Sequence, residues 1–333
     1  MPLALPLHRL PLGIVLLSLA AWAPLNAPAA PRSAPAEPSA RERPLTLPAT
    51  LEAGRFYLHP QPRQGRKLRL FSDSGGGLLF THAGAHALGV APEPRTGDAP
   101  PQLLAWPQFE SRAWIPAPQN AERGVPIAPA PPNQQHQLGD GMIGAAWFGG
   151  RSWEFDYPRG RLRLLANGAL PRVDQAHRVE LGFQKDPQGR PTTHFARIPV
   201  RIDGETLQLL FDTGATVMLT EQGVRELGDG PAVRAGSFIA AGVLRRWREK
   251  HPDWRVVERG ERNDSGRLIE VPELEVGGYR VGPVWFAERA DRNFHDYMSK
   301  WMDQRIDGAI GGNAFSSLKV SVDYPSAIAT FER

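Results

Sequence analysis

Cysteine is absent from this chain of 333 residues. Without cysteine the protein cannot contain disulfides, thiolate metal sites or a cysteine nucleophile, and it cannot carry the lipidated cysteine of a bacterial lipoprotein. Runs that mix aromatic and basic residues are also lacking, and the formal net charge is only +4. Because nucleic-acid-binding proteins gather such residues on one face, we expect no nucleic-acid partner.

Long apolar runs are scarce too. The run over residues 10–23 is shorter than the about 20 apolar residues that a transmembrane helix needs, and a proline lies at each end of it. His8 and Arg9 precede this run, and Ala27-Pro28-Ala29 follows it with the small residues that a signal peptidase requires. We therefore predict a signal peptide over residues 1–29 and a periplasmic or secreted protein. After cleavage no stable membrane span remains; the alternative is a retained anchor.

The folded part of the chain is expected to begin near Leu45. Residues 30–44 are dominated by alanine and proline, a composition that cannot form a packed core, and we interpret them as a spacer. The length of the chain allows about two domains. An apolar content of 41% is ordinary for a globular protein with a core in each half.

The chain contains an internal duplication. Residues 56–89 align without a gap on residues 195–228 and match at eleven positions, where average residue usage gives roughly two by chance. This alignment places Asp73-Ser74-Gly75 on Asp212-Thr213-Gly214. Further matched pairs are Pro60/Pro199, Gly65/Gly204, Leu68/Leu207, Leu70/Leu209, Thr81/Thr220, Gly84/Gly223 and Leu88/Leu227.

A second pair of segments repeats further along, in the same order. Asp140-Gly-Met-Ile-Gly144 is similar to Asp307-Gly-Ala-Ile-Gly311, and each segment runs on to an Asp-Tyr-Pro, at 156–158 and 323–325. A shared ancestral unit explains this order better than coincidence. We divide the chain into an N-terminal lobe (45–166), a linker (167–191) and a C-terminal lobe (192–333).

The repeats predict a mostly β fold of two lobes with a few short helices. Alternating leucines lie between glycines and prolines, which is typical of short strands and turns. We expect helices over 220–227, 236–250 and 293–304. The third carries an apolar stripe that we interpret as core packing. The basic cluster around Arg245-Arg246 is interpreted as a solvated helix end rather than an anion-binding patch.

The paired aspartates carry the chemistry. In each motif a strand delivers the carboxylate, the hydroxyl of Ser74 or Thr213 holds the loop, and Gly75 or Gly214 allows another backbone to come close. Two carboxylates within a few ångströms cannot both stay ionised, so one keeps a proton while the other is charged. The charged group can then activate a water and the protonated one can polarise a carbonyl; aspartic proteases are the established example.

These motifs resemble those of the bilobal aspartic peptidases of the pepsin and retropepsin clan, over nearly the whole mature chain. The resemblance implies two acid-protease barrels and an endopeptidase that binds a peptide or protein substrate between the lobes, acts as a monomer and needs no cofactor. It assigns catalysis to Asp73 and Asp212. The supporting loop residues are Ser74, Gly75, Thr213, Gly214 and Ala215.

Two alternatives stay open at this point. Ser72, Gly76 and Gly77 depart from the clan pattern, and no tyrosine lies between Asp73 and Asp140 to match a flap tyrosine. These departures are compatible with a catalytically impaired protein that binds a peptide or a cell-envelope component. Alternatively, a retropepsin-like dimer would use only Asp212 of each chain.

Three other motifs are weaker. Gly139 to Gly144 has the spacing of a dinucleotide fingerprint, but its repeat begins with isoleucine and an exported protein leaves the nucleotide pool, so we expect no nucleotide cofactor. His82 and His86 lie four apart without the glutamate of a zinc motif, so we expect no metal. A shifted register would set His82 against Asp212. No Gly-x-Ser-x-Gly nucleophile elbow is present.

Overall fold

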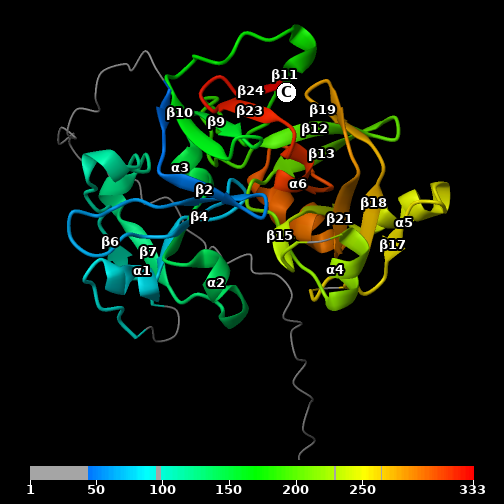
Figure 1. Cartoon of the computed structure of the whole chain (residues 1–333). Helices are drawn as coiled ribbons and strands as arrows, with labels where there is room; N and C mark the ends of the chain where they lie inside the picture. Colours follow the sequence, from blue (N-terminus) through cyan, green and yellow to red (C-terminus); the bar gives the residue numbers. More distant parts are fainter. Residues whose placement is uncertain (1–43, 95–98, 229, 264) are drawn as a thin grey trace, which may run out of the picture.

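The computed structural model describes residues 44–94, 99–228, 230–263 and 265–333. The predicted signal peptide and all of the predicted spacer except Pro44 lie outside these ranges. In the ranges described, no helix has the length and apolar character needed to cross a membrane. Figure 1 shows two β-rich lobes with a further sheet between them, which confirms the predicted mostly β, two-lobed fold with a few short helices.

The first lobe is built on a seven-stranded sheet. Its central strand pairs on one side with a parallel strand that leads to Asp73, and on the other side with an antiparallel one. In spatial order the strands are β2 (Ala49–Glu52), β3 (Arg55–Leu58), β4 (Leu70–Ser72), β8 (Gly141–Ile143), β5 (Leu79–Thr81), β7 (Val125–Ala128) and β6 (Leu103–Leu104). The helices are α1 (His82–Ala87), α2 (Gln135–Leu138) and α3 (Ala145–Phe148), with 3₁₀ turns at Ser111–Ala113, Ala121–Arg123 and Pro132–Gln134.

The second lobe repeats this arrangement on a nine-stranded sheet. In spatial order its strands are β17 (Val256–Val257), β18 (Leu268–Val271), β21 (Val284–Arg289), β16 (Ser237–Ala240), β22 (Gly308–Ile310), β13 (Glu205–Phe211), β12 (Arg197–Ile202), β19 (Leu274–Val276) and β20 (Tyr279–Val281). A separate hairpin consists of β14 (Thr216–Met218) and β15 (Val233–Ala235). The helices are α4 (Glu221–Leu227), α5 (Ala241–Lys250) and α6 (Gly312–Phe315), with a π-helix at Asn293–Tyr297 and a 3₁₀ turn at Met298–Trp301.

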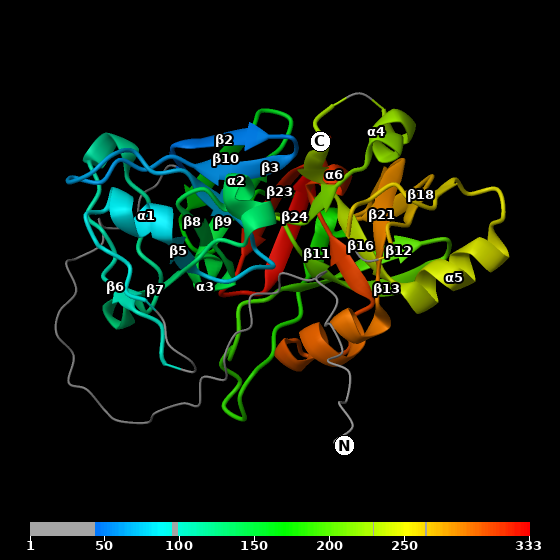
Figure 2. The same ribbon diagram turned by 90° about the horizontal axis from the view of Figure 1, so that it is seen from below.

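A six-stranded sheet joins the lobes. Its strands are β1 (Leu45–Thr46), β10 (Arg161–Leu165), β9 (Ser152–Asp156), β23 (Lys319–Asp323), β24 (Ile328–Glu332) and β11 (Arg178–Glu180), preceded by a 3₁₀ turn at Gln175–His177. The two halves meet where β9 pairs antiparallel with β23, each just before its Asp-Tyr-Pro. Seen from below in Figure 2, β9, β23 and β24 lie between the lobes.

The core beneath the aspartate loops is aromatic and fully enclosed. Phe56, Phe155, Phe211 and Phe315 are all buried without exposure. Ring centroids lie 6.0 Å apart for Phe56 and Phe155, 5.9 Å for Phe155 and Phe211, and 5.4 Å for Phe211 and Phe315. Because Phe211 directly precedes Asp212, this cluster gives the second aspartate loop a rigid base that both lobes share.

The duplicated parallel pairing is present in both lobes, in the register that the repeat indicates. Leu70 lies opposite Gly141 as Leu209 lies opposite Gly308, and Ser72 opposite Ile143 as Phe211 opposite Ile310. Beyond the aspartate loops the equivalence changes. β5 is the strand next to β8 in the first lobe, whereas the strand next to β22 is β16 and not β14.

Residues 216–235 are therefore an excursion that the first lobe lacks. The amide of Gly236 donates to the carbonyl of Ala215 at 3.0 Å, so the excursion leaves and returns at one place. The ungapped match of Thr81 with Thr220 has a local cause. Each of these threonines caps a helix by accepting a bond of 3.1 Å from the amide three residues on, at Gly84 and Gly223.

Of the predicted helices over 220–227 and 236–250, the first is present and the second begins later than expected. The helix expected over 220–227 is confirmed as α4 with Thr220 as its cap. The helix expected over 236–250 is wrong in its first part, because Ser237–Ala240 forms β16 between β22 and β21. The helix begins only at Ala241, where the amide of Gly242 donates to Asp291 at 2.8 Å. Tertiary pairing here overrides a helical pattern.

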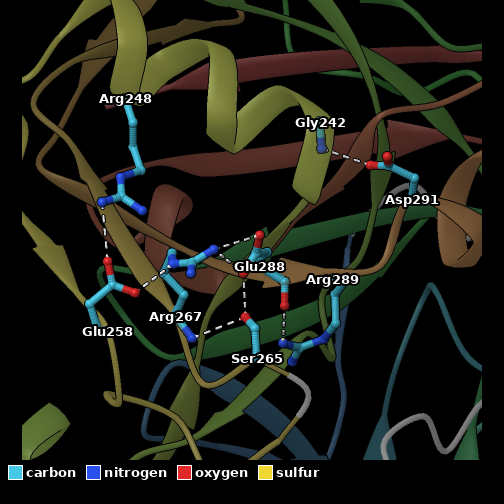
Figure 3. Close-up of polar contacts among 8 residues, drawn as sticks. All are labelled: Gly242, Arg248, Glu258, Ser265, Arg267, Glu288, Arg289 and Asp291. Carbon is cyan, nitrogen blue, oxygen red and sulfur yellow. Dashed lines mark hydrogen bonds and ion pairs between the residues drawn. The ribbon is translucent and has the colours of Figure 1, made fainter.

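The basic end of α5 belongs to a charged network on the outside of the second lobe (Figure 3). Arg248 pairs with Glu258 at 3.2 Å, and Arg267 pairs with Glu258 and with Glu288, both at 2.8 Å. The side chains of Arg245 and Arg246 are exposed, so the interpretation of this cluster as a solvated helix end is confirmed. The pair of Arg248 with Glu258 is exposed on both sides and contributes only about 0–1 kcal/mol to stability.

The stripe expected over 293–304 does face the core in part. Phe294 and Met298 are buried, while Tyr297 and Trp301 are half-buried. The segment is a π-helix followed by a 3₁₀ turn and not one α-helix.

Candidate active site

The two aspartates lie in loops that the parallel strand pairs build in the same way. Asp73 follows β4 and its amide donates to the carbonyl of Ile143 at 3.0 Å. Asp212 follows β13 and its amide donates to the carbonyl of Ile310, also at 3.0 Å. Each aspartate thus stands at the first position where the paired strands end, so the backbone of both loops is fixed by the sheet behind it.

Within each loop the backbone returns to the carboxylate. The amide of Gly75 donates to Oδ1 of Asp73 at 3.0 Å, and the amide of Gly214 donates to Oδ1 of Asp212 at 3.1 Å. The next amides, of Gly76 and Ala215, also bond to the same carboxyl groups. These contacts stabilise the charged form of each acid and fix the orientation of its side chain.

The hydroxyl residues tie one loop to the other. Ser74 Oγ donates to the carbonyl of Phe211 at 2.7 Å and accepts from the amide of Thr213 at 2.9 Å. Thr213 Oγ1 accepts from the amide of Ser74 at 3.1 Å. Both side chains are completely buried. Because these bonds cross between the lobes, the distance between the aspartates is set by the loops themselves and not only by the distant joining sheet.

Each loop glycine packs against the carboxyl group of the other lobe. A Cβ atom at Gly75 would lie 2.5 Å from Cγ of Asp212, and one at Gly214 would lie 2.3 Å from Cγ of Asp73. Contacts below about 3 Å are not tolerated by carbon atoms without movement. Glycine at both places is therefore required for the two carboxyl groups to approach each other.

The carboxyl groups are hydrogen-bonded to each other, and both have raised pKa values. Burial, then the charge of Asp73 and the bond with it, raises the pKa of Asp212 well above its usual range. Burial also raises the pKa of Asp73, but the bond from Asp212 and the amides of Gly75 and Gly76 oppose this. The two acids therefore titrate as a coupled pair, and over part of the pH range the pair holds a single proton.

The side chains next to the aspartates differ between the lobes. Phe211 precedes Asp212, whereas Ser72 precedes Asp73 and its buried hydroxyl has no hydrogen-bond partner. Thr216 Oγ1 donates to the carbonyl of Gly214 at 2.7 Å and so braces the second loop. In the first lobe Gly77 stands at the matching position of the repeat, so no such hydroxyl is present there.

All seven residues that the sequence indicated are brought together in these two loops. Asp73, and not His82, is the residue bonded to Asp212, so the shifted register is wrong. His82 and His86 are exposed on α1. Both carboxyl groups of the pair come from one chain. In this structure Asp212 therefore needs no carboxylate from a second subunit, unlike in the retropepsin-like alternative. Across the ranges described, no cluster of three or more histidine, aspartate or glutamate side chains could hold a metal ion.

Sequence reasoning missed Tyr157, Arg55 and Gln137. Burial, followed by the charge of Asp212, raises the pKa of Tyr157, whose buried hydroxyl has no partner. The repeated Asp-Tyr-Pro could have drawn attention to this tyrosine. Arg55 and Gln137 come from the first lobe and both donate to Thr216 Oγ1, at 3.3 Å and 3.2 Å. No motif marked either residue, because their contacts exist only once the lobes have docked.

No protein-family model and no curated protein matches the sequence. Solved structures that resemble it include an aspartic proteinase from Irpex lacteus, with a TM-score of 0.46 and 10% identity over 87% of this chain and 97% of that one. Basic 7S globulin from soybean gives a TM-score of 0.40 and 9% identity over 87% and 94% of the two chains. The protein edgp gives 0.38 and 12% over 89% and 96%. These values are too low to transfer an activity.

Proposed function

We propose that this protein is an exported aspartic endopeptidase, periplasmic or secreted, which hydrolyses peptide bonds as a monomer. The observation that carries the proposal is the reciprocal packing of the aspartate loops, in which each carboxyl group lies against the glycine of the opposite lobe. That packing leaves two acids sharing a proton, and one charged and one protonated carboxyl is what a general base and a general acid require at the same time.

The proposed reaction uses the two acids in turn. Charged Asp73 removes a proton from a water molecule as the water oxygen bonds to the peptide carbonyl carbon, and Asp212 gives its proton to the carbonyl oxygen. The resulting diol collapses when the proton on Asp73 passes to the amide nitrogen and the C–N bond breaks. One hydroxyl proton of the diol then returns to Asp212, which leaves a free acid, a free amine and the starting state of the pair.

Partial access of solvent to the pair favours this role. Asp73 is half-buried and Asp212 retains 9% exposure. A purely structural acid pair would be expected in the sealed core. The interlobe bonds of Ser74 and Thr213 hold the acids in place, and this positioning accounts for part of the rate increase that such a site could provide.

The test compares peptide cleavage by the parent chain with cleavage by Asp73→Asn and Asp212→Asn. We expect each variant to lose at least about 10³-fold in kcat/KM, because general acid–base catalysis contributes about 10²–10⁴-fold from each partner. Asp296→Asn, a change of an exposed carboxylate, serves as the matched control. Inhibition by a statine-type mimic is also expected. Undiminished cleavage by Asp212→Asn would remove the proposal.

A second candidate is a protein that binds a peptide or a cell-envelope component without cutting it. The favouring observation is the first loop, where Gly77 stands in place of the bracing Thr216 and where Ser72 has an unpartnered hydroxyl. Peptide binding without turnover between about pH 3 and 8, the range over which carboxyl pairs titrate, would establish this candidate instead.

A further inference from the structure

Arg55 is a buried cation with no acidic partner at the edge of the candidate active site. Its side chain begins in β3 of the first lobe, and the residue retains 5% exposure. Its hydrogen bonds go to neutral oxygens only, namely Thr216 Oγ1 at 3.3 Å and the carbonyl of Val233 at 3.0 Å. Its buried Nε has no hydrogen-bond partner. Burial accordingly lowers the pKa of this guanidinium.

The nearest carboxylate is committed elsewhere. Glu52 lies directly across from Arg55 on β2. One of its oxygens pairs with Arg69 at 2.8 Å and the other accepts from Thr50 at 2.9 Å. Arg69 in turn lies over the ring of Tyr57 at 3.7 Å. Among the residues that the structure describes, no carboxylate forms an ion pair with Arg55.

An unpaired buried charge is costly, and a folded protein usually neutralises or pairs it. Interlobe contact alone does not require a cation here. The lobes already meet at this place through the bond from the Ala235 amide to the Ala53 carbonyl at 2.8 Å. The 3.3 Å contact with Thr216 is at the long end of the range for hydrogen bonds and is therefore weak. A guanidinium in this setting has strong donors left for a planar anion.

The position links Arg55 to the proposed chemistry. Thr216 lies in the excursion of the second lobe, two residues beyond Gly214, and bonds to the carbonyl of that glycine. Gln137 on α2 adds a further donor to the same hydroxyl. Thr216 and Gln137 are both half-buried, so solvent reaches the two side chains that share this hydrogen-bonded cluster with Arg55. The result is a group of donors without an anion beside the loop that carries Asp212.

We infer that Arg55 binds a carboxylate of the peptide substrate, so that the protein selects substrates with an acidic group near the bond that is cut. This inference rests on the proposed function. The carboxylate is that of a glutamate or aspartate side chain or of the peptide terminus, and it takes the place of Thr216 Oγ1 against the guanidinium. Arg55 is then a specificity residue and not a catalytic one.

The first experiment uses matched peptides that differ only in charge. A peptide set with glutamate at each position near the cut bond is compared with the same set carrying glutamine, and free C-terminal acids are compared with C-terminal amides. We expect the parent chain to prefer one acidic peptide at least about tenfold in kcat/KM, since hydrogen bonds to charged groups are worth about 1.5–3 kcal/mol. The glutamate arm and the terminal arm distinguish the two sources of the carboxylate.

Variants at position 55 separate recognition from folding. Arg55→Met should abolish the preference for the acidic peptide. Arg55→Lys keeps the positive charge but not the planar group that binds a carboxylate through two N–H donors, so it should keep part of the preference. Thr216→Val removes the competing hydroxyl and should retain or increase the preference. If Arg55→Met lowers cleavage of glutamate and glutamine peptides equally, Arg55 only holds the lobes together and the inference is overturned. A parent chain that cleaves both sets equally overturns it too.

A binding measurement distinguishes failure of this inference from failure of the proposed function. Calorimetry of Asp212→Asn with the same peptide pairs reports recognition without turnover. If the parent chain cuts no peptide, but Asp212→Asn binds the acidic peptide tenfold more tightly and a further Arg55→Met change removes that preference, the peptidase is wrong and the carboxylate site stands. Cleavage by the parent chain with equal Kd values for both peptides would do the reverse.

Discussion

The two aspartate loops have the same backbone and different surroundings. In both, the aspartate amide bonds to the strand behind it at 3.0 Å and the glycine two residues later returns to Oδ1, at 3.0 Å in one loop and 3.1 Å in the other. The second loop is braced by Thr216 and followed by the excursion 216–235, while the first continues directly into β5. The geometry that presents the acids thus depends on backbone contacts, and the side chains around it have diverged.

This comparison assigns different roles to the two acids. The first loop leaves Asp73 half-buried with three glycines, 75–77, shortly after it, and the bond from Asp212 opposes the rise in its pKa. The second leaves Asp212 with 9% exposure and a pKa well above its usual range. Asymmetry within a nearly symmetric frame is what gives the two acids of the coupled pair different surroundings.

The largest effect is expected from filling the space between each loop glycine and the carboxyl group of the other lobe. Gly75→Ala and Gly214→Ala should each displace the facing carboxyl group, because the new Cβ would lie 2.5 Å or 2.3 Å from its Cγ. We expect a loss of about 1–3 kcal/mol in unfolding free energy and of about 10²-fold in kcat. Urea unfolding and peptide cleavage measure the two effects. Gly77→Ala, where the new Cβ would meet only Cε of Met142 at 3.7 Å, an ordinary van der Waals distance, controls for stability.

Removing the hydroxyl that ties the lobes together should cost less. Ser74→Ala leaves the carbonyl of Phe211 and the amide of Thr213 without partners in a buried place. We expect about 1–3 kcal/mol of lost stability. Ser74→Thr, the residue that the second loop uses, should recover most of it. Equal stability of the alanine and threonine variants would show that these interlobe bonds do not hold the loops.

Because the pKa of Asp212 is raised, we predict that Asp212→Asn increases the unfolding free energy, and that the increase grows with pH. Because its pKa is higher in the folded than in the unfolded state, the folded chain loses stability as pH rises from the unfolded value through the folded one. Asn at position 212 cannot ionise and removes this loss. Urea unfolding should show Asp212→Asn close to the parent near about pH 3 and more stable by about 1–2 kcal/mol at about pH 7. A gap that does not grow with pH would contradict the assignment.

The smallest effect is expected at the residue that makes the first loop unusual. Ser72→Ala removes a completely buried hydroxyl that has no partner, so the unfolding free energy should change by less than about 0.5 kcal/mol or rise slightly. Ser74→Ala, two residues away, removes a hydroxyl that is hydrogen-bonded. Comparing the unfolding free energies of the two variants therefore shows how much the hydrogen bonds of Ser74 contribute. A loss as large as that of Ser74→Ala would mean that Ser72 has a partner in solution.

The sequence predicts the frame of this molecule well because the frame is repeated. Because the strand before the aspartate and the later Gly-rich strand are both duplicated, the two lobes share one register, with Leu70 opposite Gly141 and Leu209 opposite Gly308. The ungapped alignment is misleading where two residues match only because they have the same local role. Thr81 and Thr220 cap helices in the same way. Thr81 ends β5 of the seven-stranded sheet, whereas Thr220 follows β14 of the separate hairpin, so the ungapped match conceals the excursion.

Contacts between segments far apart in the sequence could not be predicted. Ser237–Ala240 adopts a strand because β22 and β21 flank it, which no periodicity within the segment shows. Arg55 is an unremarkable arginine in the sequence, and its isolation from carboxylates depends on where Glu52, Arg69 and Thr216 point after folding. Long-range packing decides both cases, whereas the aspartate motifs are local.

The central claim is that Asp73 and Asp212 of one chain share a proton. Carboxyl-carbon NMR titration of selectively labelled aspartates tests it without a substrate, in the parent chain and in Asp73→Asn. We predict that Asp212 titrates well above its usual range in the parent and that its pKa falls in Asp73→Asn, because the facing charge is gone. An Asp212 pKa that is the same in both proteins would contradict the account.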